Sequence, residues 1–382
     1  MVPVLLMLLQ TATLPATDAA VIDDAGTITV TATRLSDLAA DAERCAKQGC
    51  PTRKDIAVSV AYASALFDDG KYLDAKAILA RTVARTKAAA KAEPLALSTL
   101  YQAQATLGLH EGDQETVHAA TWASAEVLRD ALPSDSLARL TADLRVADWQ
   151  LRSGDGTGAA QRYGDITARA GAQEIGDVAA LRRAVALEAI GQHHDAQILL
   201  QSLAARTGPE AATVRRAALA TAAKMASDGK DARRADTLVA RLVAEPAGAE
   251  PMLVSSAELP RPGKQEPEGL EVVGADRGAR GSALVGLRWV DIGYWIKPDG
   301  RVDDVRFLRG SPRLDWAQPL VGYINSRRYS PVMGGAGHYK VERYTLTSNY
   351  TTPIGSLIRR RGSNMRYEMM PVTASKQIAA AN

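Results

Sequence analysis

A glycine-containing turn recurs at nearly even intervals through the first two thirds of the chain. Its glycines are Gly70, Gly112, Gly154, Gly191 and Gly229, spaced by 42, 42, 37 and 38 residues. The segments between them are rich in alanine and have helical periodicity, and each is long enough for two helices of about 15 residues with short connections. The spacing therefore predicts five helical hairpins over residues 53–245, each of which buries its apolar stripe only against its neighbours.

The turn at Gly70 is the best-formed of the series. In Leu66-Phe-Asp-Asp-Gly70-Lys-Tyr72-Leu-Asp-Ala75, an aromatic residue and an alanine open the second helix, and in this the segment resembles the tetratricopeptide repeat (TPR) family. The resemblance implies an α-helical solenoid of TPR-like hairpins with a concave surface that binds a protein or peptide. A structural spacer is the alternative for such an array.

Helical periodicity stops after Glu245. Prolines and glycines accumulate before residue 285, a composition typical of a linker. We therefore predict a Pro/Gly-rich linker over residues 246–284 that separates the solenoid from a C-terminal domain. Its prolines are Pro246, Pro251, Pro260, Pro262 and Pro267.

Residues 285–352 differ in composition from the repeats, since they hold ten of the chain's 18 aromatic residues. Alternation predicts a strand over 287–297. Val290, Ile292, Tyr294 and Ile296 share one of its faces, and Trp289 and Trp295 lie on the other. A Pro298-Asp299-Gly300 turn, a strand over 302–308, a helix from about Trp316 to Arg327 and a strand over 339–350 follow.

Three short motifs of this region resemble the TonB C-terminal domain family. They are Pro-Asp-Gly-Arg-Val at 298–302, Leu308-Arg-Gly-Ser-Pro-Arg-Leu-Asp315 and Arg328-Tyr-Ser-Pro331. The resemblance implies a small α+β domain of order β-β-α-β over 285–352. It also implies a periplasmic protein that captures an extended segment of a TonB-dependent receptor or transport component by adding it to a sheet edge.

On this resemblance, the candidate partner-binding residues lie in the final strand and in the segment that precedes it. They are Arg327, Arg328, Tyr329, Tyr339, Val341, Arg343, Tyr344 and Leu346. The family's members that transmit energy carry a membrane-spanning helix and a long Pro-rich rod. Neither is visible here, so the sequence favours a periplasmic adaptor over a motor component.

The N-terminus indicates export. Val2–Leu9 is a short apolar run followed by small residues, so we interpret residues 1–20 as a signal peptide and 21–52 as an arm and first helix. Thr27-Ile-Thr-Val-Thr-Ala-Thr-Arg34 resembles the box that receptors present to TonB domains, although a β-branched extended arm is the simpler interpretation.

Two cysteines bear on the same question, because an exported chain meets an oxidising compartment. Cys45 and Cys50 diverge by about 140° on one continuous helix and cannot then be bridged. A helix that ends near Gln48, before Gly49 and Pro51, allows Cys50 to fold back and form a disulfide. Two reduced, buried cysteines are the alternative.

Charge is unevenly distributed along the chain. The net charge of +3 is too small to argue for nucleic acid, but residues 285–382 have 15 Lys and Arg against 7 Asp and Glu, a net of +8, which leaves 3 − 8 = −5 for the rest. Residues 353–382 are predicted to be a basic tail. Its Arg359, Arg360 and Arg361 could contact cell wall or lipid.

The sequence contains none of the common catalytic or cofactor-binding motifs that would indicate an enzyme. No nucleophile elbow, phosphate-binding glycine loop or HExxH motif occurs, and the adjacent His193 and His194 diverge on a helix. We therefore predict no catalytic residue, cofactor or metal. The leading hypothesis is a periplasmic, non-catalytic protein-binding adaptor, and the alternative is an envelope protein that binds cell wall or lipid through its basic tail.

Overall fold

The computed structural model describes residues 34–171, 173–246, 248, 250–262, 287–332, 337–351 and 360–372. The predicted signal peptide, the Thr27–Arg34 box except for its last residue, and Arg359 lie outside these ranges. Of the described residues, one compact unit holds those up to Leu107 together with Glu115–Ala142, and a second holds Gly108–Gln114 and those from Asp143 onward. None of the described helices is long and apolar enough to cross a bilayer.

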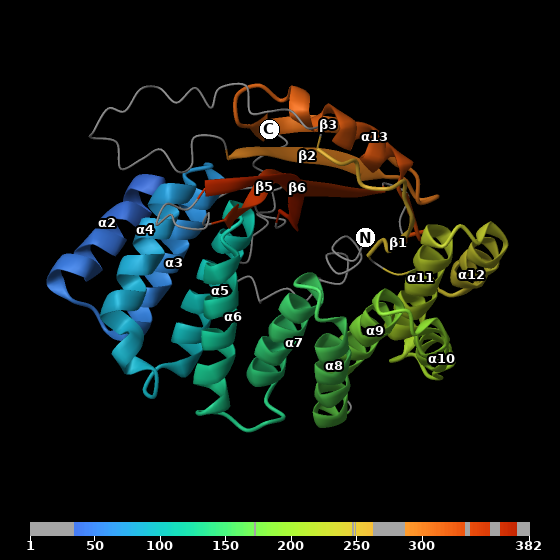
Figure 1. The fold of residues 1–382 in the computed structure, drawn as a ribbon, viewed down its shortest axis with the longest axis horizontal. Coiled ribbons are helices and arrows are strands. Elements are labelled where there is room, and N and C mark those ends of the chain that lie inside the picture. The colour runs from blue at the N-terminus through green and yellow to red at the C-terminus, as the bar shows by residue number, and fades with distance from the viewer. Residues whose placement is uncertain are drawn as a thin grey trace, which may run out of the picture. The chain divides into compact units, whose positions relative to one another are not determined.

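Five consecutive helical hairpins follow one another between Thr52 and Ala244, as the glycine spacing predicted (Figure 1). A single helix, α2 (Leu35–Gln48), precedes them. The pairs are α3 (Thr52–Asp68) with α4 (Tyr72–Thr86), α5 (Pro94–Glu111) with α6 (Gln114–Arg129), α7 (Leu137–Arg152) with α8 (Gly156–Ala170), α9 (Glu174–Ala189) with α10 (His193–Ala204), and α11 (Ala212–Asp228) with α12 (Ala232–Ala244).

The repeated glycines are needed by the turn conformation. Gly70, Gly112, Gly154 and Gly191 have φ angles of 75°, 79°, 95° and 81°, in the left-handed region that glycine adopts without strain. The last turn differs, because Gly229 has a φ of −75° and Lys230 takes the positive value of 63°. Four of the five predicted turn glycines therefore end a helix in the same way.

The predicted linker is partly built into the fold. Residues 253–255 form β1 (Leu253–Ser255), which pairs antiparallel with β4 (Arg328–Tyr329). Val254 is 4% exposed and packs with Leu219 of α11 and Leu242 of α12. The interpretation of 246–284 as linker throughout is thus wrong for this stretch, because its Leu-Val pair supplies apolar area that covers the end of the hairpin array.

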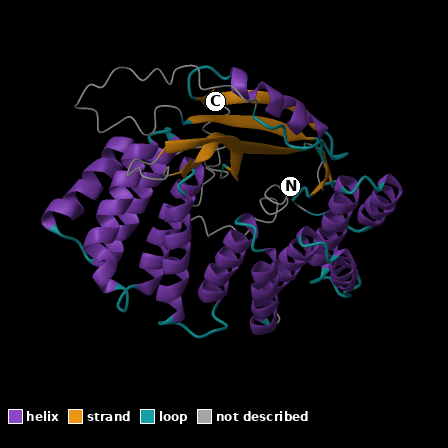
Figure 2. Cartoon of the chain, viewed as in Figure 1, coloured by secondary structure: helices purple, strands orange, loops and turns teal. Residues whose placement is uncertain are grey.

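The C-terminal part is an antiparallel sheet of order β3-β2-β5-β6. Its strands are drawn in orange in Figure 2. Its strands are β2 (Arg288–Ile296), β3 (Val302–Gly310), β5 (His338–Thr351) and β6 (Arg360–Pro371). A short 3-10 turn, η3 (Asp315–Ala317), leads into helix α13 (Gln318–Ser326) between β3 and β5. The predicted order of strand, strand, helix and strand is therefore present, with one strand added.

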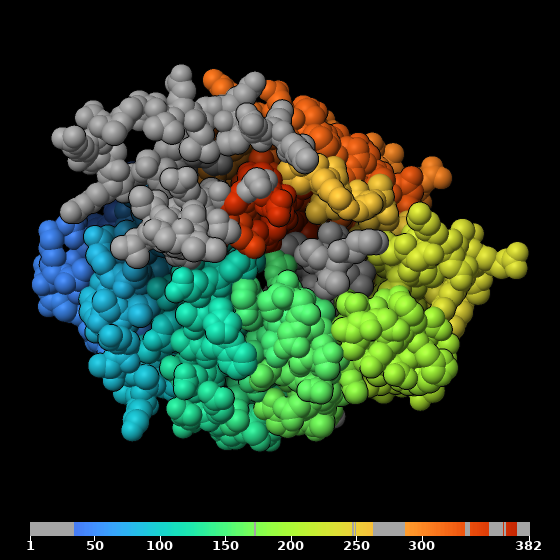
Figure 3. All heavy atoms as spheres, in the orientation of Figure 1, coloured from blue at the N-terminus to red at the C-terminus, as the bar shows by residue number. Residues whose placement is uncertain are grey.

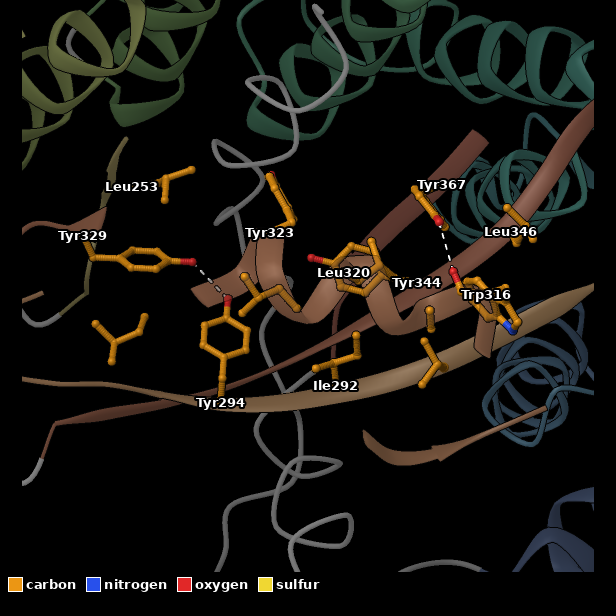
Figure 4. Packing of buried hydrophobic residues seen from close by; sticks show 14 residues of the cluster. Leu253, Ile292, Tyr294, Trp316, Leu320, Tyr323, Tyr329, Tyr344, Leu346 and Tyr367 are labelled. Carbon is orange, nitrogen blue, oxygen red and sulfur yellow. Dashed lines mark hydrogen bonds between the residues drawn. The ribbon is translucent and has the colours of Figure 1, made fainter. Parts of the chain in front are cut away.

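The predicted core face of β2 is buried against α13 (Figure 4). Val290, Ile292, Tyr294 and Ile296 are each 0% exposed, and Leu320 and Ile324 of α13 belong to the same cluster. Each such aliphatic or aromatic side chain contributes roughly 1.5–3 kcal/mol on burial. On the opposite face, Trp289 is 9% and Trp295 40% exposed, so the predicted division of faces is correct.

Strand β6 corrects the prediction of a basic tail. Arg360 and Arg361 lie in β6, where their backbones pair with Thr351 and Tyr350 of β5. Tyr367 is 7% exposed and its hydroxyl donates to the Trp316 carbonyl at 3.1 Å. Met365 and Met369 also pack on the core cluster. The alternation of these three side chains with Arg366 and Glu368 is a strand pattern that the surrounding charges obscured.

Candidate functional site

The sequence motifs place the candidate site at the edge of the sheet. Strand β5, which carries most of the candidate residues, does not form that edge. Strand β6 pairs with β5 from Glu342 opposite Pro371 to Thr351 opposite Arg360. The outer strands of the described sheet are instead β3 and β6. An added segment therefore cannot pair with β5 unless it replaces β6.

The eight candidate partner-binding residues are mostly interior. Arg328 is exposed and Tyr339 half-buried, whereas the other six are buried, with exposed fractions between 1% and 7%. Their side chains therefore build the interior of the domain. The six are Arg327, Tyr329, Val341, Arg343, Tyr344 and Leu346.

Arg327 is the centre of a buried polar cluster on the α13 side of the sheet. Its Nη1 donates to Glu342 Oε2 at 2.9 Å and to the Tyr294 hydroxyl at 2.9 Å, and its Nη2 donates to the Tyr344 hydroxyl at 2.6 Å. The guanidinium also lies 4.7 Å from the ring centroid of Tyr323. A planar guanidinium suits this arrangement, since its donors fan out toward several acceptors at once.

Glu342 receives most of the hydrogen bonds of this cluster. Tyr344 donates to Oε2 at 2.6 Å and Tyr294 to Oε1 at 2.8 Å. Burial by itself raises the pKa of the Glu342 carboxyl, but the charge of Arg327 and these hydrogen bonds outweigh burial and lower that pKa. The cluster is therefore a buried ion pair with several supporting hydrogen bonds, and such a pair fixes the packing of α13 on the sheet more than it supplies net stability.

A second ion cluster lies on the other face of the sheet. Asp291 is 0% exposed and accepts from Arg343 Nε at 2.7 Å and Arg309 Nε at 2.7 Å. The Arg343 guanidinium lies 4.1 Å from the ring centroid of Trp289, a cation–π arrangement. This face is therefore polar, in contrast to the apolar face that packs on α13.

The same polar face is covered by the turn Gly108–Gln114, which belongs to the same compact unit. His110 is 1% exposed, and its Nδ1 lies 2.9 Å from Thr345 Oγ1 of β5. Gly112 approaches the backbone so closely that a Cβ there would lie 2.0 Å from the Ser348 carbonyl oxygen. Beyond them, Arg152 Nη2 donates to Glu368 Oε2 of β6 at 2.7 Å.

Burial makes His110 a poor base. Desolvation lowers the pKa of its imidazole to about 4; the nearby Glu368 opposes this, and Arg343, Arg152 and Arg366 reinforce it. The side chain is therefore neutral near pH 7 and acts as a hydrogen-bonding partner of β5.

The two outer strands differ in their capacity to accept another strand. In β3, the register against β2 shifts twice, and Asp304 has a φ of 53°. Such bulges, together with charged residues, protect an edge from pairing. Strand β6 keeps a continuous register from Pro371 to Met365, so it offers the more regular edge.

Neither a metal site nor free thiols occur in the described part of the chain. Its His, Cys, Asp and Glu residues form no group that could hold a metal ion. Cys45 and Cys50 form a disulfide with a Cα–Cα distance of 4.9 Å, and α2 ends at Gln48 as that geometry requires.

Comparisons with known proteins identify no family for this chain. No family model matches the chain, and no curated protein does. Two solved structures of kinesin light chain TPR-like repeats from Podosopora anserina are similar. The first, a variant with one substitution, is 16% identical, covers 51% of this chain and 96% of its own, and has a TM-score of 0.43. The second is 18% identical, covers 51% and 95%, and has a TM-score of 0.41. The described chain is an array of helical hairpins followed by a small α+β sheet domain.

Proposed function

We propose that the protein is a non-catalytic adaptor that binds other proteins. The observation that carries this proposal is the run of five consecutive helical hairpins. Each hairpin in such an array contacts only its neighbours, which leaves an extended surface for a partner. A partner held there and a second one held by the sheet domain would be brought together on one chain.

The sheet domain is proposed to be a relative of the TonB C-terminal domain, in a periplasmic protein associated with TonB-dependent transport. The strand, strand, helix, strand order and the three sequence motifs support this proposal. Because β6 already pairs with β5, the proposed strand addition takes place at the outer edge of β6. Main-chain hydrogen bonds would supply affinity there, and alternate side chains would supply specificity.

Amide hydrogen exchange of the full-length chain tests strand addition. The probe is a synthetic peptide with the sequence of residues 27–34, and a matched peptide carries Val30→Pro, which removes a main-chain donor. We expect slower exchange over residues 362–370 with the first peptide and no change with the second. Residues 302–310 of β3 are the internal control. Protection that appears on β3, or on neither strand, would contradict strand addition at β6.

A further inference from the structure

A groove of about 550 Å³ lies among the last helices of the array, within one compact unit. Its floor and walls come from α10, α11 and α12, whose surfaces adjoin in the space-filling view (Figure 3). The volume falls within the range of about 300–1,000 Å³ that is typical of ligand pockets. No residue of the groove takes part in the sheet edge discussed above.

The groove exists because α12 is packed less deeply than the corresponding helices. Leu242 is the one buried residue among the 13 of α12, whereas Ala75 in α4 and Ala196 in α10 are 1% and 0% exposed. In place of another hairpin, the β1 segment covers this end of the array through Val254. That segment is narrower than a helical hairpin, and apolar side chains between α10 and α12 remain accessible as a result.

The floor of the groove is apolar. Leu200 projects from α10, Met225 from α11 and Leu238 from α12, with alanines between them. Both Met225 and Leu238 are partly exposed. A methionine in such a floor adapts its shape to different apolar groups, which suits a surface that binds side chains of a partner.

One wall of the groove is basic. Arg233, Arg234 and Arg241 of α12 line it, and within the described ranges none of their guanidinium groups makes an ion pair or a side-chain hydrogen bond. By contrast, Arg215 in the neighbouring α11 pairs with Glu245 at 3.0 Å. Unpaired guanidinium groups beside an apolar floor are suited to carboxylates, which they can bind with two parallel hydrogen bonds.

The acidic side chains of the groove are already engaged. Glu188 lies 2.9 Å from His193 Nδ1. Asp231 Oδ1 accepts from the Arg234 backbone N–H at 3.1 Å and so caps α12. Neither carboxylate forms an ion pair with the guanidinium groups, and the net charge of the wall is positive.

We propose that this groove binds an acidic amphipathic segment of a partner protein. The segment's apolar side chains lie on Met225 and Leu238, beside the buried Leu200, and its carboxylates pair with the arginines of α12. This inference rests on the proposed adaptor function and names the chemistry of one partner. It is independent of strand addition at β6.

Fluorescence anisotropy with the full-length chain tests the proposal. The probe is a labelled helical peptide of about 14 residues with Leu at i, i+3, i+4 and i+7 and Glu elsewhere; a second probe has Lys in place of Glu. We expect saturable binding of the Glu probe that weakens as salt is added, and weaker binding of the Lys probe. Equal binding of both probes, or none of the Glu probe, would overturn the proposal.

Charge-reversed variants locate the site. Arg234→Glu/Arg241→Glu should weaken binding of the Glu probe by roughly tenfold or more, and Leu238→Ser should weaken it without changing its salt dependence. Lys87→Glu/Lys91→Glu, an exposed pair in the other compact unit, makes the same charge change and should have no effect. Equal losses in both double variants would place the interaction elsewhere. The arginine double variant should lose binding of the Glu probe but still show slower exchange over β6 with the peptide of residues 27–34. That result would show that the groove and the edge of β6 are independent sites.

Discussion

Buried ionisable side chains are the feature at residue scale that most distinguishes this protein. Glu342 and Asp291 lie inside the two central strands of the sheet, and each has an arginine partner of its own. Charged residues within a core strand are tolerated only when they are paired. Their presence in Val341-Glu342-Arg343 and Val290-Asp291-Ile292 was a signal that the sequence analysis did not use.

His110 should make stability depend on pH. Its pKa is about 4 in the folded chain, against 6.5 for the exposed group, so the unfolded chain binds more protons between these values. The contribution of His110 to the free energy of unfolding is fully present above about pH 6.5, and about 3 kcal/mol of it is lost as the pH approaches 4. Urea denaturation from pH 7 to 4.5 measures this slope. In His110→Gln the slope should become shallower, whereas the exposed His194→Gln should retain it.

Replacing one member of the Arg327–Glu342 pair should lower the free energy of unfolding more than replacing both members. Glu342→Gln leaves a buried guanidinium without its counter-charge, and we expect a loss of about 3–5 kcal/mol in the free energy of unfolding. Arg327→Met/Glu342→Leu should recover much of that loss. Chemical denaturation monitored by tryptophan fluorescence measures both. Glu126→Gln, which breaks the exposed pair with Arg129 at 3.9 Å, is the control; an equally small effect at Glu342 would disprove the buried ion pair.

At the scale of elements, the sequence correctly predicted the helices and turns whose ends are marked by glycine. The hairpin turns carry glycine at the position that needs a left-handed conformation, and the helix before Cys50 ends where Gly49 requires. Strand β1 was not predicted because three residues are too few to show periodicity. Strand β6 was not predicted because its position depends on pairing with β5, and that long-range contact leaves only a weak local signal.

The Cys45–Cys50 disulfide should stabilise the attachment of α2. It closes a loop with a sequence separation of 5, and the chain-entropy estimate for such a loop is about 2 kcal/mol. Reductant should therefore lower the thermal midpoint of the wild-type chain. Cys45→Ser/Cys50→Ser should already melt at the lower temperature and should not respond to reductant. A wild-type midpoint that is unchanged by reductant would exclude a stabilising bridge.

At the scale of the whole molecule, the sequence predicted the two kinds of architecture but not the intramolecular contacts of the sheet. Repeat spacing is a local property, and it indicated the helical hairpins correctly. The candidate site depended on which strand forms the edge, and β6 occupies the edge of β5. The eight residues chosen for it are mostly interior because α13 packs on one face of the sheet and the turn Gly108–Gln114 on the other. The groove at α12 could not be predicted, since it arises from the absence of a further hairpin against that helix.

The contact between His110 and Thr345 joins positions separated by 235 residues. The turn Gly108–Gln114 is synthesised long before β5. Until β5 is made, the polar groups of this turn remain in contact with water. Chains generally fold from the N-terminus as they emerge, and distant pairings form slowly. We therefore expect the hairpins to acquire helical structure early, while the side of the turn that packs on the sheet stays exposed until β5 has been synthesised.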